Sequence, residues 1–127
     1  LGADQVLAFE DELISKVESL DAAKALLRRL SGKRHELISA AVLARGGTAV
    51  WRQQGRVRLQ VRTLSDAFID DYVASEGEAL LHCVGCYRLE GLGAQLFDRI
   101  EGDYFTVLGL PLLPLLAQLR EMDILPK

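Results

Sequence analysis

The sequence predicts a mixed α/β protein, with a largely antiparallel sheet flanked by helices. Segments with strand periodicity alternate with segments with helical periodicity, and a Gly46-Gly47 turn joins two β-compatible stretches near the middle of the chain. The 127 residues contain no internal repeat and no Pro/Ser-rich linker. We therefore expect a single domain over residues 1–127.

Capping residues and periodicity place the individual elements. Ser19 or Asp21 can cap a helix that ends before Gly32, and Ser65 can cap a second helix. Polar and apolar residues alternate over 56–63, which is typical of a strand with one polar face. The predicted strands cover 6–9, 35–45, 48–53, 56–63 and 95–100, the predicted helices cover 22–30, 68–73 and 112–122, and residues 78–92 are expected to mix turns with a strand.

Composition excludes several classes of partner. The chain carries 15 basic and 18 acidic side chains, a formal net charge of −3, so there is no bulk attraction to a nucleic acid polymer or to an anionic membrane. The apolar run over 107–117 contains Gly109, Pro111 and Pro114 and is too short to span a bilayer. Two cysteines are too few for a disulfide framework, and we expect a cytoplasmic protein.

Asp4 and Lys16 are the first candidates for chemistry. Asp4 lies near the start of an apolar strand, where it is either a metal ligand, a base that orients water, or an ordinary turn residue. Lys16 follows Leu13-Ile14, and if that stretch pairs with the first strand, both side chains point to one end of the sheet. A lysine beside a carboxylate suits a polyphosphate that carries a divalent cation.

Two further motifs have alternative interpretations. The segment His82-Cys83-Val84-Gly85-Cys86 lacks the second pair of ligands that a zinc site needs, and small buried residues are the simpler interpretation. Gly91-Leu92-Gly93 either lets the backbone approach a nucleotide or makes a tight turn. Glu90 beside it can accept hydrogen bonds from the edge of a base.

Ordered sequence blocks extend over nearly the whole chain. They are Gly2-Ala3-Asp4-Gln5-Val6, Leu30-Ser31-Gly32-Lys33-Arg34-His35-Glu36, Val61-Arg62-Thr63-Leu64-Ser65, Gly85-Cys86-Tyr87-Arg88-Leu89-Glu90-Gly91-Leu92-Gly93, and Arg99-Ile100-Glu101-Gly102-Asp103-Tyr104 followed by Val107-Leu108-Gly109-Leu110-Pro111-Leu112. In this order and at this spacing, they resemble the Maf family of nucleoside triphosphate pyrophosphatases.

The resemblance implies a fold and an activity. It implies an ITPase-like fold with a nucleotide cleft between two lobes, commonly in a homodimer. It also implies hydrolysis of a nucleoside triphosphate to the monophosphate and pyrophosphate, with a divalent cation (Mg²⁺ or Mn²⁺). The family opens with a Ser-x-Ser-Pro-Arg-Arg segment that grips the phosphates and has no counterpart here. We therefore expect residues 1–127 to be the C-terminal two-thirds of a Maf-like protein.

The resemblance also assigns roles to three residues. Asp4 matches the catalytic aspartate that binds metal or activates water, and Lys16 matches a phosphate-contacting lysine, in Ser15-Lys16-Val17 where the family usually has Gly-Lys-Pro. Glu90 matches a substrate-binding position that is Glu in members resembling 7-methyl-GTP hydrolases and Gln in those resembling dTTP/UTP hydrolases. This favours 7-methyl-GTP-type substrates. The alternatives are a non-catalytic nucleotide-binding regulator of cell division and, third, a cysteine-based metal or redox module.

Overall fold

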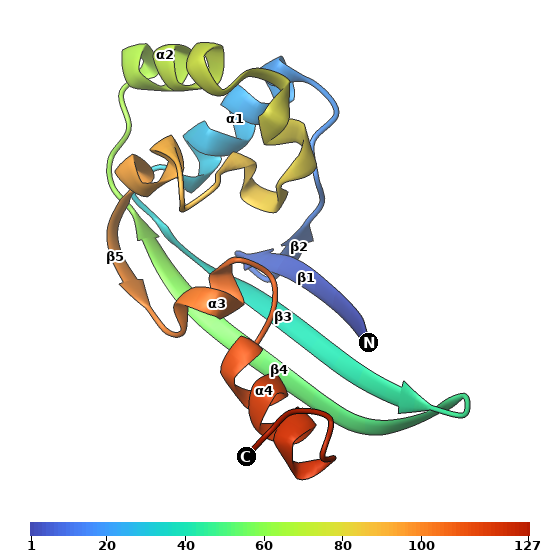
Figure 1. Cartoon of the computed structure of the whole chain (residues 1–127). Coiled ribbons are helices and arrows are strands. Elements are labelled where there is room, and N and C mark those ends of the chain that lie inside the picture. Colours follow the sequence, from blue (N-terminus) through green and yellow to red (C-terminus); the bar gives the residue numbers. More distant parts are fainter.

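A five-stranded antiparallel sheet forms the centre of the molecule, in the order β2-β1-β3-β4-β5 (Figure 1). The structure, a computed structural model, describes residues 1–127. The strands are β1 (Gly2–Phe9), β2 (Glu12–Ile14), β3 (Arg34–Arg45), β4 (Thr48–Val61) and β5 (Phe97–Glu101). The predicted fold class is confirmed.

The β3–β4 hairpin is the longest part of the sheet. Gly46 and Gly47 have φ values of +60° and +79°, the left-handed conformation that a two-residue hairpin turn requires at both positions. Along β4, Val57 and Leu59 are fully buried and the arginines between and before them are exposed, as the alternation predicts. The sequence predicted two separate strands here. They form one strand because Gly55 stays in register opposite Ser39.

Two of the helices begin at the residues that the sequence marks. Ser19 accepts a hydrogen bond from the backbone N–H of Ala22 (3.1 Å) at the start of α1 (Leu20–Leu30), so Ser19 rather than Asp21 is the cap. Ser65 does the same for Phe68 (3.0 Å) at the start of α2 (Asp66–Glu76). The remaining helical elements are η1 (Gly77–His82), η2 (Val84–Cys86), η3 (Leu92–Leu96), α3 (Tyr104–Val107) and α4 (Leu112–Glu121).

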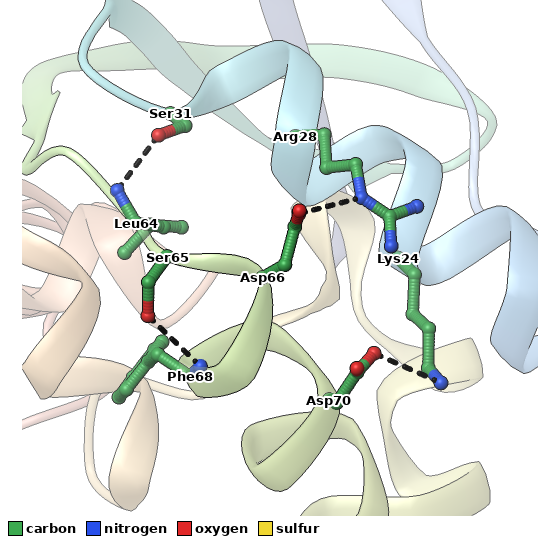
Figure 2. Close-up of polar contacts among 8 residues, drawn as sticks. All are labelled: Lys24, Arg28, Ser31, Leu64, Ser65, Asp66, Phe68 and Asp70. Carbon is green, nitrogen blue, oxygen red and sulfur yellow. Dashed lines mark hydrogen bonds and ion pairs between the residues drawn. The ribbon is translucent and has the colours of Figure 1, made fainter.

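Polar contacts join α1 to α2 (Figure 2). Arg28 pairs with Asp66, and Lys24 pairs with Asp70, each at 3.2 Å. The Ser31 hydroxyl just after α1 accepts the backbone N–H of Leu64 at 2.8 Å. These exposed ion pairs add little stability singly. The apolar faces of the two helices contribute more, because Leu26, Leu27, Ile69, Tyr72 and Val73 all belong to the buried core.

Residues 78–92 form short 3₁₀ turns and no strand, so the expectation of a strand there is wrong. Gly85 (φ +81°) and Cys86 (φ +60°) are successive left-handed residues, which an extended strand cannot contain. The predicted C-terminal helix is present as α4. Leu115 is its buried residue, and Leu113 is 58% exposed. The first strand begins earlier than predicted because Gly2–Val6 also pair with β3.

The elements are divided between the two ends of the sheet (Figure 1). The helices α1 and α2 and the 3₁₀ turns gather at one end, and the β3–β4 hairpin extends away from them. The short helix α3 packs against β3 and β4, and α4 packs against β4. No helix has the length and apolar character needed to cross a membrane.

Candidate functional site

One cavity of about 380 Å³ brings together segments that lie far apart in the sequence. The three predicted site residues, Asp4, Lys16 and Glu90, all line it. Its other lining residues are Ala3, Gln5, Leu37, His82, Cys83, Val84, Tyr87, Arg88, Leu89, Val107, Leu108 and Gly109. The cavity is large enough for a small molecule of nucleotide size.

The β1–β2 hairpin positions Asp4 and Lys16. Leu7 pairs with Ile14, so the hairpin on which the juxtaposition of these two side chains depended is present. Its turn uses left-handed backbone at Glu10 (φ +51°) and Asp11 (φ +64°). Lys16 lies two residues after the end of β2, and it lines the cavity together with Asp4 of β1.

None of the three charged side chains is engaged by another charge of the chain. All three are exposed, and no ion pair of the structure includes Asp4, Lys16 or Glu90. The Asp4 Oδ1 atom accepts only the backbone N–H of Gln5, at 2.8 Å. Two carboxylates and an ammonium group in the cavity are thus available to a bound molecule.

Gln5 holds one wall of the cavity in place. Its Nε2 atom donates to the carbonyl oxygens of Thr106 (3.0 Å) and Val107 (2.9 Å) and approaches the Ser39 hydroxyl at 3.2 Å. The Ser39 hydroxyl also donates to the Thr106 carbonyl, at 2.7 Å. Gln5 thus fixes the C-terminal end of α3, at Thr106 and Val107, against β1 and β3. No local pattern of residues indicates this contact, which joins residues about a hundred positions apart.

Close backbone packing shapes the turn that carries Glu90. A Cβ atom on Gly93 would lie 2.4 Å from the Arg88 carbonyl oxygen, and the N–H of Gly91 donates to that oxygen at 3.1 Å. The glycine pair therefore makes a tight turn of the chain on itself, the second of the two interpretations above. The turn brings Arg88, which we did not predict as a site residue, into the cavity with Glu90.

The two cysteines are free thiols in different surroundings. Cys86 is buried, and burial raises the pKa of its thiol to about 11. Cys83 lines the cavity and is half-buried, and burial raises its pKa as well. No group of three or more His, Cys, Asp or Glu side chains is arranged to hold a metal ion. Both cysteines are therefore held mainly as unreactive thiols at neutral pH.

A buried His35–Tyr87 pair lies behind the cavity wall. The His35 Nε2 atom lies 2.8 Å from the Tyr87 hydroxyl oxygen, while His35 Nδ1 is buried without a hydrogen-bond partner. Desolvation lowers the pKa of His35 to about 4, so the imidazole is neutral at pH 7. The Tyr87 ring, which lines the cavity, packs edge-on against Phe97 with ring centroids 4.8 Å apart.

We expect acid to destabilise the protein through His35. The unfolded chain binds a proton near pH 6.5 and the folded chain only near pH 4. The stabilising effect of the neutral imidazole is therefore complete above pH 6.5 and is lost as the pH falls toward 4, by about 2 kcal/mol between pH 7 and pH 5. Urea unfolding of His35→Gln should show a correspondingly smaller loss over this range, with the exposed-site variant His82→Gln as the control. Equal losses in the wild type and in His35→Gln would contradict the assignment.

The structure defines a mixed α/β protein with a polar cleft open beside an antiparallel sheet. Comparison with known proteins identifies it further: the family model described as "Maf-like protein" matches residues 1–122, and the chain belongs to this family. The resemblance stated from the sequence blocks is confirmed.

Curated relatives carry two names. The chain is 55% identical over 126 residues to "Nucleoside triphosphate pyrophosphatase" of Hyphomonas neptunium, covering 99% of this chain and 64% of the relative. It is 55% identical over 120 residues to the protein of the same name from Caulobacter vibrioides (94% and 60%). It is 50% identical over 122 residues to "7-methyl-GTP pyrophosphatase" of Rhizobium meliloti (96% and 61%). The chain thus spans less than two-thirds of the length of these relatives.

Proposed function

We propose that the protein is a nucleoside triphosphate pyrophosphatase, which hydrolyses its substrate to the nucleoside monophosphate and pyrophosphate. The observation that carries the proposal is the placement of Asp4, Lys16 and Glu90, none of them in an ion pair, in one cavity of nucleotide size. The names of relatives about half identical to this chain support the same reaction.

In the proposed reaction, water attacks the α-phosphorus and the bond to the β-phosphate oxygen breaks. Asp4 orients the water and accepts its proton, because a carboxylate with only one hydrogen bond has lone pairs free for this role. Lys16 offsets the negative charge that builds on the departing pyrophosphate. The electron pair of the broken bond leaves with the pyrophosphate.

We propose that the reaction uses a divalent cation, Mg²⁺ or Mn²⁺. The chain offers no cage of three or more ligands, which fits an ion bound by one carboxylate and by the phosphates of the substrate rather than by protein alone. Asp4 would hold this cation, which when bound neutralises phosphate charge and polarises the phosphorus.

We propose a preference for 7-methyl-GTP-type substrates. Glu90 places an exposed carboxylate at the cavity, and methylation at N7 gives guanine a positive charge that a carboxylate attracts. Relatives bearing the 7-methyl-GTP name match this chain about as closely as several of the others. From the family resemblance, we also propose that the protein is cytoplasmic and that it forms a homodimer. Light scattering of the purified protein tests the dimer.

A panel of triphosphates tests the proposed function. The full-length protein is assayed with 7-methyl-GTP, GTP, dTTP and UTP in the presence of Mg²⁺ or Mn²⁺, and pyrophosphate and monophosphate are both measured. We expect equimolar pyrophosphate and monophosphate, with the highest kcat/KM for 7-methyl-GTP. Release of orthophosphate would contradict the reaction. Tight binding without turnover would support instead the alternative function, a non-catalytic nucleotide-binding regulator of cell division.

A further inference from the structure

Arg88 is the second cationic side chain that lines the cavity, beside Lys16. Its Nη2 atom donates to Oε2 of Glu76, the last residue of α2, at 3.1 Å. The Arg88 side chain is 45% exposed, whereas the Glu76 side chain is only 7% exposed. The pair therefore consists of a buried carboxylate and a guanidinium group that still reaches solvent.

This pair differs from the other ion pairs of the chain. In all the others, the acidic side chain is at least 26% exposed. An exposed pair leaves both partners mobile and contributes little energy. A buried carboxylate is itself held in one place, so it fixes the direction of the arginine that it binds. Glu76 therefore acts as an anchor for Arg88.

The backbone of Arg88 is fixed as well. The Arg88 carbonyl oxygen accepts the N–H of Gly91, and Gly93 packs so closely that a Cβ atom there would lie 2.8 Å from the Arg88 nitrogen. Both ends of the arginine are therefore held before any molecule binds. A group that is already in position loses little conformational entropy on binding.

Arg88 adds a positive charge to a cavity that is lined by both acidic and basic side chains. Asp4 and Glu90 contribute two negative charges to the cavity wall, and Lys16 contributes one positive charge. Lys16 and Arg88 line the same cavity. A polyphosphate bound there would meet both cations.

We propose that Arg88, anchored by Glu76, binds the polyphosphate of the substrate together with Lys16. The guanidinium group has five N–H donors in a planar fork, so it can keep its bond to Glu76 and still donate to phosphate oxygens. The three donors of a lysine radiate from a single nitrogen, so lysine lacks the planar fork that spans two acceptor groups. Glu76 is then a positioning residue. This inference rests on the proposed function, because it assumes a nucleotide in this cavity.

The test compares Arg88→Gln, Arg88→Lys and Glu76→Gln with the wild-type full-length protein. We expect Arg88→Gln to raise KM for 7-methyl-GTP and the inhibition constant of inorganic pyrophosphate about tenfold or more, and to change kcat much less. Glu76→Gln should raise both constants by a smaller factor, and both constants of Arg88→Lys should fall between those of the wild type and those of Arg88→Gln. Binding of 7-methylguanosine, which has no phosphate, should not change.

Arg99→Gln is the matched control, since Arg99 pairs with Glu101 at 2.8 Å outside the cavity. Unchanged pyrophosphate affinity in both Arg88 variants would overturn the proposal. So would an equal loss of affinity for 7-methylguanosine and 7-methyl-GTP, because it would mean that Arg88 acts only through the fold. If Arg88→Gln does not fold, the pyrophosphate affinity of Arg88→Lys, which retains the charge, tests the proposal.

Calorimetric titration with inorganic pyrophosphate separates this inference from the proposed function. If the wild type shows no turnover but binds pyrophosphate, and Arg88→Gln binds it about tenfold more weakly, Arg88 is a phosphate ligand in a protein that is not a pyrophosphatase. If the wild type turns over triphosphates and Arg88→Gln does so with the same KM, the enzyme assignment stands and the role of Arg88 is refuted.

Discussion

Asp4→Asn in the full-length protein is expected to lower kcat for pyrophosphate release at least about a hundredfold. The asparagine side chain cannot accept a proton from water and is a poorer ligand for a divalent cation. Its Oδ1 atom can still accept the Gln5 N–H that Asp4 accepts at 2.8 Å, so the start of β1 should keep its conformation. The measurement is the steady-state rate of pyrophosphate release at saturating 7-methyl-GTP.

Asp98→Asn provides the control for this prediction. Asp98 is an exposed carboxylate on β5 that does not line the cavity, so its loss should leave kcat unchanged. A reduction of less than tenfold in Asp4→Asn would exclude a central role for Asp4. Unfolding curves of both variants should superimpose on that of the wild type.

The second large effect is expected at Gly55. A Cβ atom at this position would lie 2.4 Å from Thr106 Oγ1 and 2.9 Å from Thr106 Cγ2, and Thr106 is buried. Gly55→Ala must therefore displace α3 and the cavity wall behind it, which Gln5 holds through the Thr106 and Val107 carbonyl oxygens. We expect a loss of about 1–3 kcal/mol in the free energy of unfolding, as for other overpacked sites, together with a raised KM.

Two further variants test this mechanism for Gly55. Gly2→Ala is the control, because a Cβ atom there meets nothing within 4 Å. Thr106→Ala removes the two atoms that would clash most, so the double variant Gly55→Ala/Thr106→Ala should be more stable than the sum of the single losses predicts. Strict additivity of the two losses in urea unfolding would argue against direct contact.

Local patterns in the sequence were sufficient to place most of the sheet and two helices. A helix cap, a two-residue turn and alternation along a strand each depend on residues close in sequence, such as Ser19, Ser65 and Gly46-Gly47. The strand expected within 78–92 was wrong because the backbone is left-handed at two successive residues. One of these residues is Cys86, and its residue type does not indicate a left-handed conformation.

The cavity was predictable only in part. The expected pairing of the first two strands was enough to predict that Asp4 and Lys16 lie near each other, and family resemblance added Glu90. The contact between Gln5 and the Thr106 carbonyl, and the burial of Glu76 behind Arg88, are tertiary features. No local pattern predicts them, because in the sequence Gln5 and Glu76 look like ordinary polar residues of the surface.

The walls of the cavity come from both ends of the chain and from its middle. Ala3 and Gly109 line the same cavity, and the cavity is lost if β1, β3 and β4 separate. Binding in the cavity is therefore linked to global unfolding, because the cavity exists only in the folded protein. A molecule present at a hundred times its dissociation constant raises the free energy of unfolding by about 2.7 kcal/mol. Thermal denaturation therefore tests the proposed binding of a nucleotide independently of any turnover.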